Sequence, residues 1–151
     1  MTADIPAEAD RTTNPLAPFG DLADFAAVPR VAGLRLSPDG SWLAATVQTL
    51  SADRKRYLTS IWRIDTQGGP SRRLTRSAEG EGSPRFLPDG SLLFISKRSG
   101  PGASAPGSSG ATVSSLWLLP AAGGEARVVA ALPGGVAATE VASGSGAVVV
   151  A

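Results

Sequence analysis

The sequence predicts an all-β protein, an incomplete β-propeller of about two and a half four-stranded antiparallel blades. A ten-residue block with Pro-Asp-Gly at its centre, Leu34 to Leu43, recurs as Pro84 to Leu93. A second block, Ser60 to Gly69, recurs without a gap as Ser115 to Gly124. A repeat of about 50 residues made of strands and turns is typical of propellers and solenoids.

Composition agrees with many short strands in one folded domain. The chain of 151 residues holds 18 glycines and 12 prolines, 42% hydrophobic residues and 18% charged residues. Its net charge of +1 gives no strong field toward nucleic acid, and we expect no nucleic-acid partner. The apolar stretches are far shorter than the roughly 20 residues of a bilayer span, so we expect no membrane association.

The N-terminal residues precede the propeller. Residues 1–20 are polar and rich in proline, which predicts a disordered tail. Asp21 is a suitable cap for one short helix that runs to Val28, and Pro29 ends it. The start of the chain lacks the basic and apolar segments of a secretory signal, so we expect a cytoplasmic protein.

The first blade is predicted over 31–75, within a propeller region 21–151. Ser37-Pro38-Asp39-Gly40 fits a type I turn, because proline pre-sets φ and glycine accepts a positive φ. Two arginines in the last strand suit an exposed edge. The four expected strands are Val31–Leu36, Trp42–Gln48, Tyr57–Asp65 and Ser71–Thr75.

The second blade is predicted over 84–130 with the same order. Its middle loop, 99–110, consists mostly of Gly, Ser, Ala and Pro, so we expect it to be flexible. A third blade begins in 138–151, where residues 143–146 form the turn and Ala147–Val150 the second strand. The chain looks like the first blades of a longer protein, and we expect its last strand to promote self-association.

The sequence offers no catalytic, cofactor-binding or metal-binding residue. It contains no histidine and no cysteine, which excludes a Ser-His-Asp triad and thiolate sites from this chain. Asp39 and Asp89 occupy equivalent positions in the two turns. Capping of the turn is a simpler interpretation of these carboxylates than metal binding. Trp62 and Trp117 occupy equivalent repeat positions and are predicted to be largely buried core residues.

Three stretches carry a resemblance to a known family. They are the Leu-Ser-Pro-Asp-Gly block at 36–40, the Trp-x-Ile-Asp strand at 62–65 and the Gly-Gly-x-x-Arg-x-Leu-Thr segment at 68–75. Together they resemble the propeller repeat of the prolyl oligopeptidase family of serine peptidases. The acylaminoacyl-peptidase and dipeptidyl-aminopeptidase-like branch is the most similar. The resemblance covers about 21–151.

This resemblance implies a function for the parent protein. In the family, the propeller screens peptide substrates by size before they reach a C-terminal α/β-hydrolase domain. That domain and the peptide substrates are therefore the expected partners, and no cofactor is expected. The alternative is a non-catalytic protein-interaction propeller of the Tol-Pal or WD-like type, which shares the repeat.

Overall fold

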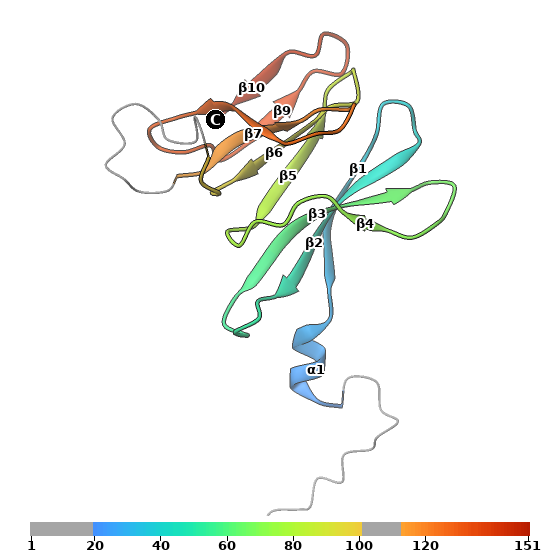
Figure 1. The fold of residues 1–151 in the computed structure, drawn as a ribbon, viewed down its shortest axis with the longest axis vertical. Helices are drawn as coiled ribbons and strands as arrows, with labels where there is room; N and C mark the ends of the chain where they lie inside the picture. Colours follow the sequence, from blue (N-terminus) through green and yellow to red (C-terminus); the bar gives the residue numbers. More distant parts are fainter. Residues whose placement is uncertain (1–19, 101–112) are drawn as a thin grey trace, which may run out of the picture.

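Two four-stranded antiparallel sheets and one two-stranded sheet make up the described chain (Figure 1). The computed structural model describes residues 20–100 and 113–151, so all but the last residue of the predicted tail 1–20 and most of the loop 99–110 lie outside it. Blade 1 consists of β1 (Arg30–Leu36), β2 (Trp42–Leu50), β3 (Tyr57–Asp65) and β4 (Arg72–Arg73). Blade 2 consists of β5 (Glu81–Phe86), β6 (Leu92–Ser96), β7 (Ser115–Leu119) and β8 (Arg127–Ala131). The third sheet consists of β9 (Thr139–Val141) and β10 (Val148–Val150).

The strands of each blade follow one another in chain order across the sheet. This meander repeats along the chain, and the fold is an incomplete β-propeller, as the sequence predicts. The outer strand β4 is shorter than the predicted Ser71–Thr75, because Thr75 leaves the ladder. Its hydroxyl oxygen accepts a hydrogen bond from the Ile61 amide at 2.9 Å, and only Arg72 and Arg73 pair with β3.

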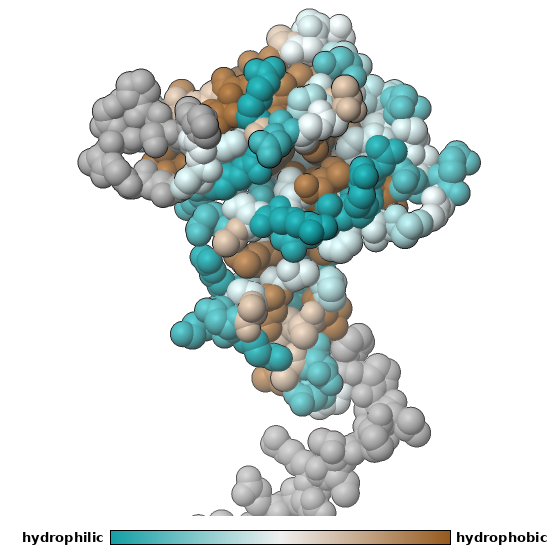
Figure 2. Space-filling view, viewed as in Figure 1, coloured by the Kyte–Doolittle hydropathy of each residue, from teal (hydrophilic) through white to brown (hydrophobic). Residues whose placement is uncertain are grey.

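The predicted short helix is present as α1 (Leu22–Ala27). A carboxylate oxygen of Asp21 accepts a hydrogen bond from the Ala23 amide at 2.6 Å, which satisfies a free donor of the first turn. Figure 2 shows apolar side chains at the surface of this helix, in the lower part of the view, and Leu22 is 79% exposed. The helix is attached to blade 1 by the Tyr57 hydroxyl, which donates to the Ala26 carbonyl at 3.0 Å.

Strand registers define which residues of the two blades are equivalent. Leu36 pairs with Leu43 in blade 1, and Phe86 pairs with Leu92 in blade 2. The first repeat therefore has one more residue between its turn and its second strand than the second repeat, which the equal lengths of the two Pro-Asp-Gly blocks do not show. From there the match continues, and Trp62 and Trp117 are equivalent because they pair with Ala45 and Phe94, themselves equivalent.

The main core lies between the two blades. We call the side of a blade that carries its tryptophan the tryptophan face. In blade 2 this face packs against the opposite face of blade 1. The buried members of this core are Ala44 and Ile61 from blade 1, and Leu92, Phe94 and Trp117 from blade 2. A second core joins the opposite face of blade 2 to the third sheet, with Leu93, Leu116 and Val136 buried.

The tryptophan face of blade 1 has no sheet over it among the described residues. Leu34 and Leu36 on this face are 48% and 56% exposed, whereas the Leu36 equivalent Phe86 packs against the core. Trp117 is 4% exposed, as predicted for both tryptophans, whereas Trp62 is partly exposed and so less completely buried than its equivalent. The positions are equivalent, but blade 1 covers only Trp117.

The third sheet is a hairpin that begins the same pattern again. The Gly146 amide donates to the Ala142 carbonyl at 2.8 Å and closes the turn, with Gly146 at a φ of 70°. In the described residues β10 pairs only with β9, so its other side is an open sheet edge. Within the same residues no helix is long and apolar enough to cross a bilayer.

Candidate functional site

A groove between blades 1 and 2 is bordered by polar side chains. It has a volume of about 870 Å3 and lies where both Pro-Asp-Gly turns meet. It contains charges of both signs beside an aromatic ring. Its charged and aromatic lining residues are Asp39, Trp42, Arg63, Arg72 and Arg73 of blade 1 and Asp89 of blade 2.

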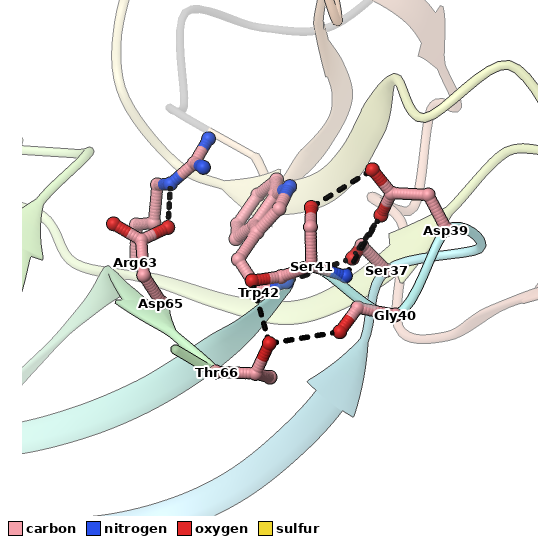
Figure 3. Close-up of polar contacts among 8 residues, drawn as sticks. All are labelled: Ser37, Asp39, Gly40, Ser41, Trp42, Arg63, Asp65 and Thr66. Carbon is pink, nitrogen blue, oxygen red and sulfur yellow. Dashed lines mark hydrogen bonds and ion pairs between the residues drawn. The ribbon is translucent and has the colours of Figure 1, made fainter. Parts of the chain in front are cut away.

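The Asp39 carboxylate holds the turn of blade 1 together (Figure 3). It accepts hydrogen bonds from the Ser37 hydroxyl at 2.6 Å, the Ser41 hydroxyl at 2.8 Å and the Ser41 amide at 3.1 Å. These bonds, with that of Ser37 the strongest, lower the pKa of Asp39 from 3.8 to about 2. Asp39 is therefore ionised at neutral pH, and its carboxylate oxygens accept hydrogen bonds within its own turn.

The turn of blade 2 has a simpler version of the same arrangement. Asp89 accepts hydrogen bonds from the amide of Ser91 at 2.9 Å and from its hydroxyl at 3.1 Å. The Ser91 hydroxyl oxygen also accepts from the Ala121 amide at 3.2 Å, which ties this turn to the next hairpin. In blade 1 the Thr66 hydroxyl makes that tie, donating to the Ser41 carbonyl at 2.9 Å (Figure 3). Both aspartates thus cap turns.

Arginines form the cationic part of the groove. The Arg63 Nε lies 2.7 Å from a carboxylate oxygen of Asp65. The guanidinium of Arg63 stacks over Trp42, with its central carbon 4.8 Å from the centre of the ring. Arg73 donates to the Thr75 carbonyl at 2.6 Å, while Arg72 is exposed. From the sequence alone, Arg72 and Arg73 were expected only to protect an exposed strand edge. Their place in a groove depends on the packing of two blades, which no local pattern shows.

The groove has the chemistry of a contact surface. The pair most like a nucleophile and base is Ser37 with Asp39, but a carboxylate with a pKa of about 2 is too weak a base to activate a serine hydroxyl. In the described residues no three acidic side chains gather as a metal site would require. Arginine, tryptophan and proline side chains can instead contact an extended peptide through charge and stacking.

Replacing Asp39 by Asn is expected to destabilise the protein in a pH-dependent way. The folded-state pKa of Asp39 is below its unfolded value, so its ionised form stabilises the fold at neutral pH, and this contribution disappears as the pH falls from about 4 to about 2. Melting temperatures of parent and Asp39→Asn should differ at pH 7 and converge toward pH 2. A difference that stays constant over this range would contradict the capping role.

Comparison with known proteins relates the chain to a peptidase. No protein-family model matches it. Over 114 residues the chain is 31% identical to the uncharacterized peptidase YuxL of Bacillus subtilis strain 168, a match that covers 75% of this chain and 16% of YuxL. The solved structure of a TolB-like protein from Agrobacterium tumefaciens matches with a TM-score of 0.44 and 25% identity, covering 66% of this chain and 32% of that one.

The match to YuxL supports the sequence-based resemblance at a general level. Because this relative is named a peptidase and its match covers 75% of the chain, the chain is a propeller related to a peptidase. The chain spans only 16% of that relative's length. The particular family and branch, and the cytoplasmic location, stay predictions.

Proposed function

We propose that this chain is the propeller segment of a serine peptidase of the prolyl oligopeptidase type and that it screens peptides by size. In this proposal the catalytic groups belong to a separate α/β-hydrolase domain. The observation that carries the proposal is the 31% identity to a peptidase over 114 residues, combined with the repeated blades. The chain has no histidine to serve as a general base.

Peptide hydrolysis by the full-length gene product tests this proposal. N-acylated peptides of increasing length should be cleaved with a turnover that falls steeply with length, and a folded protein should be spared, because a propeller admits only small substrates. A serine-directed inhibitor should abolish the cleavage. The 151-residue chain alone is the control and should have no turnover.

Two results would overturn the proposal. One is a full-length gene product that cleaves no peptide of any length, which would favour the alternative of a non-catalytic interaction propeller. The other is equal cleavage of short peptides and of an intact folded protein, which would contradict screening by size and leave the peptidase activity in place.

A further inference from the structure

The first strands of the three sheets lie side by side and carry charges at one equivalent position. β5 contacts both β1 and β9, and each of these strands is an edge of its own sheet. Arg35 pairs with Ala44 in blade 1, and its equivalent Arg85 pairs with Leu93 in blade 2. Glu140 occupies the same position in the third sheet. The side that the first strands share therefore presents a row of two arginines and one glutamate.

The three charges are not paired equally. Arg85 Nε donates to a carboxylate oxygen of Glu140 at 2.9 Å, and a second nitrogen of Arg85 binds the other oxygen. This contact, with a smaller contribution from the charge of Arg35, lowers the pKa of Glu140. Arg35 is exposed, and the ion pairs among the described residues do not include it. Its guanidinium has the Leu34 carbonyl as its hydrogen-bond acceptor, at 2.8 Å.

A small pocket lies beside Arg35, between β1 and β5. We call it the inner-strand pocket. It has a volume of about 220 Å3, and both Arg35 and Arg85 border it. β1 and β5 are each irregular here, because Ala32 and the pair Ser83-Pro84 have no partner in the strand registers.

Ser83 in this pocket has a φ of 53°, an unfavourable conformation for a residue with a Cβ atom. β-Bulges and strained residues of this kind are common at binding sites, where they turn the chain toward a ligand. The strain at Ser83 is therefore a second feature, independent of the arginines, that points to this pocket.

We propose that the inner-strand pocket binds the carboxylate of a peptide, with Arg35 as its main ligand. The planar fork of arginine matches a carboxylate with two parallel hydrogen bonds. Two arginines and one glutamate leave one net positive charge, which a single carboxylate neutralises and a doubly charged phosphate exceeds. This inference deepens the proposed function and rests on it for the peptide nature of the ligand.

Calorimetric titration of the full-length gene product tests the pocket directly. N-acetyl-Ala-Ala with a free carboxylate should bind at least about tenfold more tightly than the same dipeptide as its C-terminal amide. Arg35→Gln should abolish this difference, and Arg35→Lys should keep part of it because the charge remains without the fork. Glu140→Gln should tighten binding, because it removes the competing carboxylate.

Arg127→Gln is the matched control, since Arg127 is an exposed arginine on the outer strand β8 and should be dispensable for this binding. Three results would overturn the inference: equal binding of acid and amide, equal losses for Arg35→Gln and Arg127→Gln, or inorganic phosphate competing better than acetate. Failure here is distinct from failure of the proposed function, which is measured by peptide cleavage. A protein that binds the carboxylate without cleaving peptides would support the proposed pocket and contradict the proposed peptidase function.

Discussion

The purified 151-residue chain is expected to self-associate at micromolar concentration, and Leu36→Glu to shift it toward the monomer. The tryptophan face of blade 1 leaves Val31, Leu34 and Leu36 exposed by 61%, 48% and 56%. Its equivalent in blade 2 is covered by another sheet and forms the main core. A face built for burial and left open is a site of association.

The edge of β10 adds a second route to association. This strand consists of three valines, is paired on one side only and carries no charge, so its free backbone groups can pair with another chain. Val149 is 68% exposed, and Val149→Lys should weaken this route without disturbing the core. The arginines of β4 protect only their own edge. Both variants together should give the most monomeric protein.

Size-exclusion chromatography with light scattering measures this prediction. Leu22→Glu is the matched control, because Leu22 is 79% exposed on α1, outside the sheets, and should leave the association unchanged. A parent chain that is a monodisperse monomer with a sharp, cooperative melt would contradict the expectation. The open face would then be compatible with a self-sufficient domain.

Trp117→Ala is expected to lower the free energy of unfolding by roughly 3–5 kcal/mol. Trp117 is 4% exposed at the centre of the core between the blades. Its ring also lies under the Arg98 guanidinium at 3.9 Å, where burial lowers the pKa of Arg98 and strengthens the contact between cation and ring. Removing the indole leaves a cavity and takes away this contact at once.

Trp62→Ala provides the comparison, because Trp62 is the equivalent residue on the open face. Its cost in the 151-residue chain should be smaller, about 1–2 kcal/mol, since the Trp62 side chain is already partly exposed to water. Urea unfolding of both variants measures the difference, with Trp117→Phe as a milder change that retains an aromatic ring. Equal costs at the two positions would contradict the assignment of Trp117 to the core between the blades.

The repeated blocks made much of the fold predictable from the sequence. β3 spans the predicted Tyr57–Asp65, because its alternating apolar residues and the Gly-Gly turn after it are local signals. The cap of Asp21 and the turn at Asp39 were also recognisable, since each uses side chains that bind their own backbone within a few residues. Local chemistry of this kind does not depend on which sheet packs next to which.

The rest depends on contacts between repeats. The extra residue near Trp42 changes which residues of β2 and β6 are equivalent, and only the strand registers show it. The different burial of Trp62 and Trp117 comes from the presence or absence of a neighbouring sheet. The row of Arg35, Arg85 and Glu140 joins residues far apart in sequence, and no motif marks it.

The exposure of Trp62 in an experimental structure of the full-length gene product tests the central claim most directly. If the chain is part of a peptidase propeller, a second β-sheet should lie on the face that carries Leu34, Leu36 and Trp62. The Trp62 side chain should then be as buried as Trp117, which is 4% exposed here. A full-length structure in which this face stays in water, with Trp62 still half-buried, would contradict the propeller account.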